Sequence, residues 1–307
     1  MGEFDDVIVV RDKVTKKQKR EIRKSYNKWA REVREQAKQL QRSGDVSSIT
    51  RARDLAALYY QLRNSSKQLT AEINGSINTN ANIIADTTVA VNKRWLTSLG
   101  FNTNNVDFRF AASKEYAIRN IMSGNIYSSG FSLSTRIWMS TDGNMKDIYT
   151  IIAKGVAEDK SIYQIAKDIE KYVKPDARFP WRVTTGGDGK IYKIKNGTVD
   201  YNAQRLAKTV LQHTYQQTLI ALTRDNPFVD GYIWHSDGGH PCELCQDRDG
   251  QFYTADDVPL DHPNGECTIE PHIDRAKAMS DLAGWYNNPV EYPSIESFAS
   301  GMTFKVD

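Results

Sequence analysis

The sequence predicts an α+β protein that is predominantly α-helical. We expect a long N-terminal helical hairpin, followed by a mixed C-terminal domain with a small zinc-clasped β unit. Three observations predict this class: apolar residues recur at helical spacing through the first hundred residues, short alternating segments follow turn dipeptides in the second half, and every cysteine lies between residues 242 and 267. At 307 residues, the chain is long enough for two domains.

The first predicted helix runs from Lys16 to Arg42, a stretch without Gly or Pro. Its apolar residues share one helical face at three- and four-residue steps: Ile22, Tyr26, Trp29, Val33, Ala37 and Leu40. A Ser-Gly-Asp stop at 43–45 precedes a second apolar series, which predicts a helix returning antiparallel to the first: Leu55, Leu58, Tyr59, Leu62, Leu69 and Ile73. We expect the polar stretch "NGSINTNAN" to break this helix, and helical structure to resume from about Ile83 to Leu99.

The rest of the chain predicts shorter elements. "SKEYAIRNIMSG" favours a helix, residues 144–173 favour two helices broken at Gly155 and at 160–161, and "RVTTGGDGKIYKIKNGTVDY" favours a β-hairpin. A helix is predicted over 201–224, then a turn and a strand after "NPFVD". We divide the chain into a basic helical arm (1–100), a connecting segment (101–141), a domain holding the cysteines (142–275) and a C-terminal tail (276–307).

Positive charge is concentrated near the N-terminus. The net charge is +3, yet residues 11–67 hold 17 Lys and Arg against 6 Asp and Glu. On the first helix, the cations surround the face opposite the apolar residues: Lys17, Arg20, Lys24, Lys28, Arg31, Arg34 and Lys38. Such a face suits sequence-independent contact with double-stranded DNA; the alternatives are a solvated face or pairing with acids of a partner protein. The sequence has no run of about 18 apolar residues, so it predicts no membrane-spanning segment.

The cysteine segment has the spacing Cys242-x2-Cys245-x16-His262-x4-Cys267. Two thiolates on a tight turn and a distant His/Cys pair supply the four N/S ligands that tetrahedral Zn²⁺ prefers. His240 is the substitute if His262 points away. Three buried thiols that merely pack in a core are the alternative interpretation.

Two enzyme families share parts of this segment's pattern. "PCELC" matches half of the zinc nucleobase deaminase pattern, but none of the upstream histidines begins the required H-x-E, so that chemistry lacks its general acid/base. "LDHPN" after a C-x-x-C is also typical of HNH-type nucleases, with Asp256, Asp257 and Asp261 as candidate cation ligands. That pattern needs a later Asn and His, and only His272 lies downstream.

The stretch from "YNAQRLAKTVLQHTYQQTLIALTRDNPFVDGYIWHSDGGHPCELCQDRDGQFY" to "HPNGECT" resembles the C-terminal domain of phage Mu F-like minor head proteins, the phage head morphogenesis or minor capsid family. "GFSLSTRIW" and "IIAKGVAEDKSIYQIAKDIEKYV" extend the resemblance to roughly residues 125–272. Two departures stand out: the family's Cys-Arg-Cys is Gly265-Glu266-Cys267 here, and Thr209 is followed by Val210 where the family often has Glu.

The resemblance implies a structural component of a tailed-phage virion, without catalysis. Its expected place is inside the capsid near the portal vertex, after assembly in the host cytoplasm. Expected partners are the portal protein, the major capsid or scaffolding protein, and the packaged double-stranded DNA; expected roles are head assembly and genome packaging or ejection. Carried onto this chain, the metal set is Cys242, Cys245, His262 and Cys267. A metal-dependent nuclease and a cellular zinc-containing DNA-binding protein are the alternatives.

Overall fold

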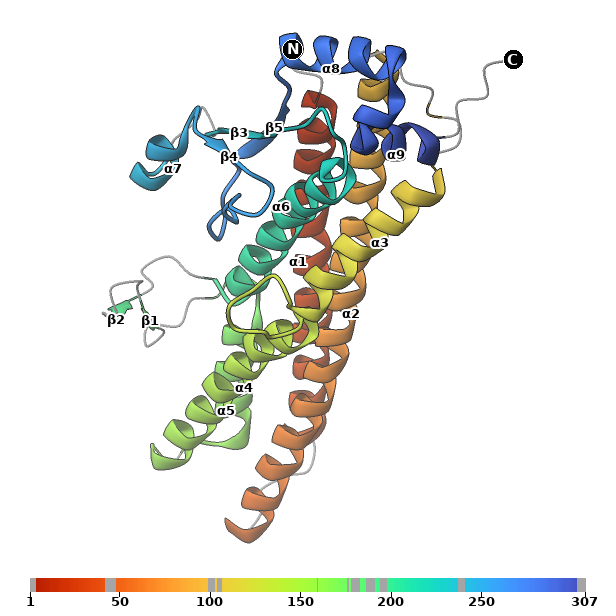
Figure 1. Cartoon of the computed structure of the whole chain (residues 1–307). Coiled ribbons are helices and arrows are strands. Elements are labelled where there is room, and N and C mark those ends of the chain that lie inside the picture. Colours follow the sequence, from red (N-terminus) through yellow and green to blue (C-terminus); the bar gives the residue numbers. More distant parts are fainter. Residues whose placement is uncertain are drawn as a thin grey trace. The chain divides into compact units, whose positions relative to one another are not determined.

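The structure is a computed structural model that describes residues 4–41, 48–98, 103, 107–158, 160–175, 177, 183–185, 191–193, 198–236 and 241–302. It is mostly helical, with long N-terminal helices and a small three-stranded antiparallel sheet near a cluster of Cys and His residues (Figure 1). The predicted fold class is therefore confirmed. Within the ranges just given, no helix is long and apolar enough to cross a membrane.

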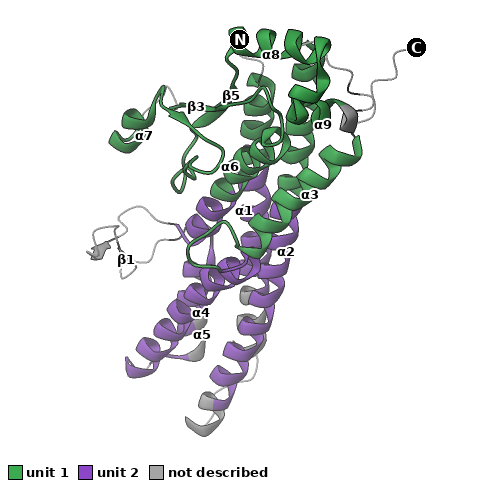
Figure 2. Cartoon of the chain, viewed as in Figure 1, with its two compact units in different colours: residues 1–15, 79–130, 208–307 green, residues 16–78, 131–207 purple. Residues whose placement is uncertain are grey.

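The chain forms two compact units (Figure 2). Unit 1 comprises residues 1–15, 79–130 and 208–307, and unit 2 comprises residues 16–78 and 131–207. The helices α1 (Asp5–Gln41), α2 (Ser48–Ser98) and α6 (Tyr201–Thr223) each contribute residues to both units. Each unit is assembled from segments that are separate in sequence. The division into four consecutive segments stays a prediction.

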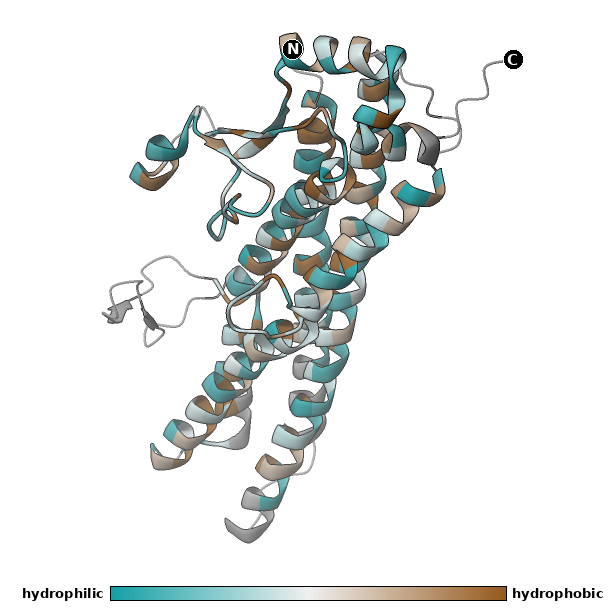
Figure 3. Cartoon of the chain, in the orientation of Figure 1, coloured by the Kyte–Doolittle hydropathy of each residue, from teal (hydrophilic) through white to brown (hydrophobic). Residues whose placement is uncertain are grey.

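In unit 2, α1 and α2 pack as an antiparallel pair. Trp29 Nε1 donates to Ser65 Oγ at 3.1 Å, and Gln18 Nε2 donates to Ser76 Oγ at 2.8 Å. The residue later in α1 thus contacts the residue earlier in α2, which shows that the two helices run in opposite directions. The predicted seam is confirmed by side chains that are almost fully buried: Ile22, Tyr26, Trp29, Leu58, Leu62 and Ile73. Apolar residues are interspersed with hydrophilic ones along these helices (Figure 3). The side chains of Val33, Ala37 and Leu40, and the stop at 43–45, lie outside the described residues.

The predicted break in the second helix is wrong, because α2 continues without interruption through "NGSINTNAN". Ile73, Ile77, Ala81 and Ile84 are buried at three- and four-residue steps on both sides of Gly75. Burial of this apolar row outweighs the weak helix propensity of the Asn and Gly residues between its members, since propensity contributes only up to about 1 kcal/mol per residue.

Two shorter helices follow in unit 2. Ser132 begins α4 (Leu133–Ala157) by accepting a hydrogen bond from the Thr135 amide, and Ser161 begins α5 (Ile162–Val173) through a capping box with Gln164. The predicted break at 160–161 is thereby confirmed. The predicted break at Gly155 is wrong, because Gly155 lies inside α4, where its missing side chain leaves room for Ile165 of α5.

The predicted hairpin in unit 2 is also confirmed. It consists of β1 (Val183–Thr185) and β2 (Ile191–Lys193), which pair antiparallel.

Unit 1 contains the three-stranded sheet in the order β4-β3-β5. The central strand β3 (Gly231–His235) pairs antiparallel with β4 (Phe252–Tyr253) and with β5 (Thr268–His272), and Trp234 lies opposite Ile269. Helix α6 buries Leu211, Tyr215 and Leu219 in the same core. Tyr215 donates from its hydroxyl to the Ile269 carbonyl at 2.7 Å, which joins the helix to β5.

Further helices complete unit 1. These are α3 (Asp107–Ser123), the short α7 (Glu243–Arg248), α8 (Arg275–Asn287), the 3-10 turn η1 (Pro289–Glu291) and α9 (Pro293–Met302). Asp274 caps α8, while Ile295 and Phe298 of α9 are buried in the core. The segment predicted as a tail is therefore largely helical in its described part.

The close approach at Gly155 gives a test of the α4–α5 packing. A Cβ at Gly155 would lie 2.5 Å from Cγ1 of the buried Ile165, whereas a Cβ at Gly143, in the same helix, would meet nothing within 4 Å. We expect Gly155→Ala to lower the free energy of unfolding by about 1–3 kcal/mol through overpacking. Gly143→Ala should raise it by up to about 1 kcal/mol, because Ala loses less backbone entropy in a helix. Urea unfolding of both variants measures this, and equal effects would contradict the packing.

Candidate metal centre

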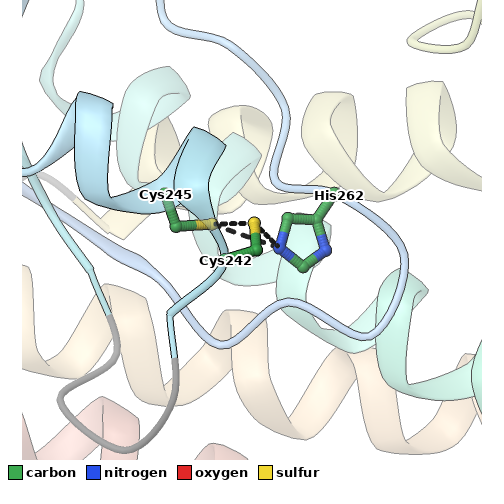
Figure 4. Close-up of side chains that lie close together, drawn as sticks. All are labelled: Cys242, Cys245 and His262. Carbon is green, nitrogen blue, oxygen red and sulfur yellow. Dashed lines mark hydrogen bonds between the residues drawn. The ribbon is translucent and has the colours of Figure 1, made fainter.

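Four sequence-predicted ligands and one further carboxylate come together in unit 1. Ligand atoms of Cys242, Cys245 and His262 lie within 4.8 Å of one another, and so do those of Cys245, Asp261 and Cys267. Cys245 belongs to both groups. Figure 4 shows the side chains of the first group converging from α7 and from the loop before β5. We call Cys242, Cys245, His262 and Cys267 the Cys/His cluster; its residues could hold a metal ion. His240, the proposed substitute, lies outside the described residues.

The distances within the first group suit one shared ion. The sulfurs of Cys242 and Cys245 are 3.5 Å apart, and His262 Nε2 lies 3.4 Å from the Cys242 sulfur and 3.1 Å from the Cys245 sulfur. Tetrahedral ligands at normal Zn–S and Zn–N lengths would be separated by about 3.8 Å for two sulfurs and about 3.5 Å for sulfur and nitrogen. An ion therefore needs only small shifts of these side chains.

The C-x-x-C turn brings its two sulfurs together. Cys242 is the N-cap of α7, and its carbonyl accepts from the amides of Cys245 and Gln246, each at 2.9 Å. A hydrogen bond from the backbone of Cys245 lowers the pKa of the Cys242 thiol, whereas burial raises the pKa of Cys245. A bound divalent cation would offset that burial cost, because it favours the thiolate form of both residues.

His262 is held in the tautomer that a metal ligand needs. Its Nδ1 lies 3.1 Å from the carbonyl oxygen of Pro263. A carbonyl only accepts, so Nδ1 carries the proton and Nε2 presents its lone pair toward the sulfurs of Cys242 and Cys245.

Asp261 joins two of the predicted ligands through their backbones. Its carboxylate is buried and accepts from the His262 amide at 2.8 Å and from the Cys267 amide at 3.1 Å. Burial raises the pKa of Asp261, and these hydrogen bonds act against that rise. A side chain at Gly265 would overlap this carboxylate, so glycine is needed there.

The loop turns sharply between His262 and Cys267. Asn264 has a positive φ of 68°, a conformation that Asn tolerates better than most residues, and the Gly265 amide donates to the His262 carbonyl at 2.8 Å. The "HPNG" sequence thus forms the turn that returns the chain toward the sulfurs.

A polar row on α6 anchors this loop. Its members lie at positions i, i+3, i+4 and i+7, and all four are buried: Thr209, Gln212, His213 and Gln216. Thr209 accepts from the Asn264 amide at 3.1 Å, and Gln212 donates to the Cys267 carbonyl. We name these four residues the α6 polar row.

The other two members of the row contact Asp261 itself. His213 Nε2 donates to the Asp261 carbonyl at 2.8 Å, so its Nδ1 accepts from the Tyr127 hydroxyl at 3.1 Å. Gln216 accepts from the Asp261 amide at 3.2 Å. The α6 polar row thus fixes the backbone at both ends of residues 261–267, which we call the ligand loop.

Arg11 of α1 extends this network. It is almost fully buried and donates to the Gln212 side chain at 2.7 Å and to the Glu266 carbonyl at 3.2 Å. Sequence reasoning missed Arg11 and the α6 polar row. Polar residues at helical spacing within an otherwise apolar helix were the available signal for the row; nothing in the sequence linked Arg11 to it.

The three aspartates considered for a nuclease site are not gathered together. Asp256 pairs with Arg224 at 2.7 Å, and Asp257 accepts from the Thr254 hydroxyl at 2.7 Å. Across the part of the chain that the structure describes, neither belongs to a group of side chains suited to a metal ion, whereas Asp261 does.

The predicted DNA-contacting cations lie on α1, and those that are described belong to unit 2. Lys17, Arg20, Lys24, Lys28 and Arg31 are exposed, while the side chains of Arg34 and Lys38 lie outside the described residues. Two of the exposed cations have carboxylate partners: Lys17 pairs with Glu21 at 3.5 Å, and Lys28 pairs with Glu72.

No protein-family model matches the chain, and neither a curated protein nor a solved structure matches it.

The shared position of Cys245 predicts how metal binding responds to single substitutions. Cys245→Ser should abolish tight binding of one ion per chain, because Cys245 belongs to both groups of ligands. Cys242→Ser should weaken binding less, because Cys242 is exposed and belongs to one group. Competition with a metal-sensitive dye measures both affinities. Equal, unchanged affinities would contradict a metal centre at this cluster.

The bridging position of Asp261 predicts a second effect. Asp261→Asn replaces one acceptor oxygen with a donor that faces an amide donor, so the ligand loop should lose its fixed geometry. We expect metal affinity to fall by about 10- to 100-fold, as for other residues that orient metal ligands. Asp256→Asn, in the exposed loop, is the matched control and should leave affinity unchanged. If Cys267→Ala keeps the metal while Asp261→Ala loses it, Asp261 is itself the ligand.

Proposed function

We propose that this chain is a structural minor head protein of a tailed bacteriophage. It would lie inside the capsid near the portal vertex and assist head assembly and genome packaging or ejection. The observation that carries the proposal is the Cys/His cluster, because it lies within the residues that resemble Mu F-like minor head proteins. The assignment rests on that motif and on the geometry of its residues.

The metal in this proposal is Zn²⁺ with a structural role. Three thiolates and one imidazole form a soft donor set that suits Zn²⁺ over Mg²⁺ or Ca²⁺. Four protein ligands fill a tetrahedral shell and leave no position for a reactive water. The ion would then clasp the loop between α7 and β5 to the core of unit 1, and no catalysis is assigned to it.

Contact with packaged DNA is the second part of the proposal. The cations of α1 would neutralise backbone phosphates, so binding would not depend on base sequence. Deleting the arm is a poor test, because Phe4 and, on α1, Val7 and Val14 are buried in the core of unit 1. Substitutions of exposed cations leave that core intact.

The role in the virion is tested by the composition of particles. Antibody or mass spectrometry should detect the chain in mature phage, in a fixed low copy number and associated with the portal after gentle disassembly. Its absence from purified particles, or a gene in a cellular genome without phage neighbours, would contradict the proposal and favour a cellular zinc-containing DNA-binding protein.

The structural role of the metal predicts a defined response to chelation. Protein purified under reducing conditions should contain about one Zn²⁺ per chain by elemental analysis. Removing it should reduce the near-ultraviolet circular dichroism, while most of the helical signal remains. Trp234 belongs to the same buried core as Cys245 and Cys267, and Tyr253 packs against that core. Protein without metal, or complete unfolding on chelation, would contradict this.

A nuclease is separated from a structural protein by a cleavage assay. Purified protein should leave duplex DNA intact with Mg²⁺, Mn²⁺ or Zn²⁺ present, because the proposed coordination shell is closed. Cleavage that His262→Ala abolishes while folding is preserved would replace our proposal with the metal-dependent nuclease.

The DNA contact predicts salt-dependent binding. About five phosphate contacts should give a slope of about −4 to −5 in a plot of log affinity against log salt for duplex DNA. Two unrelated duplexes should bind equally. A flat salt dependence would contradict DNA contact without touching the role of the metal.

A further inference from the structure

A pocket in unit 2 is lined almost entirely by cations. It has a volume of about 610 Å³ and lies between α1 and the residue that follows α5. Two of its described lining residues, Asn27 and Ala30, are uncharged. The other five are positively charged: Arg20, Arg23, Lys24, Arg31 and Lys174. Among the described residues, no carboxylate lines it. We call this the basic pocket.

The cations of the basic pocket differ from other cations of α1 in their partners. Lys17 and Lys28, outside the pocket, pair with Glu21 and Glu72. Hydrogen bonding to Glu72 raises the pKa of Lys28. Among the described residues, by contrast, no carboxylate forms an ion pair with a cation of the basic pocket. Like charges gathered in one hollow repel, and a polyanion is the ligand that would relieve this repulsion.

The spacing along α1 fits a regular row of anions. The α1 residues of the pocket follow helical steps from position 20 to position 31, so they occupy one face. Their backbone positions span about 16 Å at 1.5 Å per residue. One DNA strand presents about five phosphates over that axial length, at about 3.4 Å each. Arg guanidinium groups also bind phosphate oxygens in a bidentate manner.

We propose that the basic pocket is a binding site for the phosphate backbone of duplex DNA, with Lys174 as a contact residue contributed from outside the helical arm. This deepens the DNA contact proposed above and rests on it. It also changes the predicted set of DNA-contacting residues. Arg23 and Lys174 are added to the set, whereas Lys17 and Lys28 pair with carboxylates. Lys174 is the decisive residue, because it lies far from α1 in sequence and reaches DNA only if the pocket is the site.

Two matched pairs of variants test the site in the full-length protein. Arg23→Gln with Lys24→Gln removes two pocket cations, and Lys17→Gln with Lys28→Gln removes two paired cations from the same helix. Lys174→Gln is matched by Lys146→Gln, an exposed cation of unit 2 that pairs with Asp142 at 3.3 Å. Gln and the cations it replaces have similar helix propensities. The probe is a 20-base-pair duplex titrated across a salt series, and thermal melts check folding.

The wild-type slope tests DNA contact, and the variants test the pocket. Each lost phosphate contact should reduce the slope by about 0.9 and weaken binding about eightfold at 0.1 M salt. Lys174→Gln should lose one contact and show this change. The double variant Arg23→Gln with Lys24→Gln should change the slope about twice as much. The control, Lys17→Gln with Lys28→Gln, should change the slope by less than half as much as the Arg23/Lys24 double variant. If the wild type binds but both double variants lose affinity equally, or Lys174→Gln matches Lys146→Gln, the pocket is not the site.

A competitor decides the chemical class of the ligand. Polyglutamate offers carboxylates, and tripolyphosphate offers phosphates, on flexible chains. Displacement of the duplex by tripolyphosphate, reduced in Lys174→Gln, supports phosphate recognition. Displacement by polyglutamate at equal charge concentration, with equal dependence on Lys174, would overturn the proposal and assign the pocket to an acidic protein partner.

Discussion

The structure around the candidate metal centre depends on hydrogen bonds between buried side chains of α6 and the backbone of residues 261–267. A buried polar group that lacks its partner costs about 1–3 kcal/mol, so the loss of any one of these contacts would destabilise the loop. They hold a loop with little apolar side-chain volume of its own. Strand β5 begins directly after this loop at Thr268, so the register of Trp234 with Ile269 follows from the same contacts. The loop, the sheet and the sulfurs are therefore one packed arrangement.

Asp261 connects the backbones of two residues of the Cys/His cluster. One carboxylate oxygen accepts from the His262 amide and the other accepts from the Cys267 amide. Gly265 leaves the space that this carboxylate occupies. A short buried acid can thus fix the separation of two residues that could hold a metal ion.

The sequence predicted those features that depend on local pattern. Helical spacing located the buried seam of Ile22, Tyr26 and Trp29, and the spacing of Cys and His residues located the cluster. Turn dipeptides located the hairpin at 183–193. Each of these signals lies within one short stretch of sequence.

Features that depend on distant partners escaped prediction. The continuity of α2 through Gly75 is decided by the burial of Ile73 and Ile77, which local propensity does not record. Helix α8 has no apolar periodicity strong enough to signal it, since none of its residues is buried. Arg11 meets Glu266 across 255 positions of sequence, and no local pattern reveals such a pairing.

That long-range pairing has a consequence for the order in which the protein is made. Arg11 is synthesised before its partners Gln212 and Glu266, which follow 201 and 255 residues later. At a synthesis rate of about 5–20 residues per second, the delay before Glu266 is made is roughly 13–50 s. During that interval the buried side chains of Phe4 and Val7 have no complete core to enter. The buried network of unit 1 therefore cannot be completed before Glu266 has been synthesised.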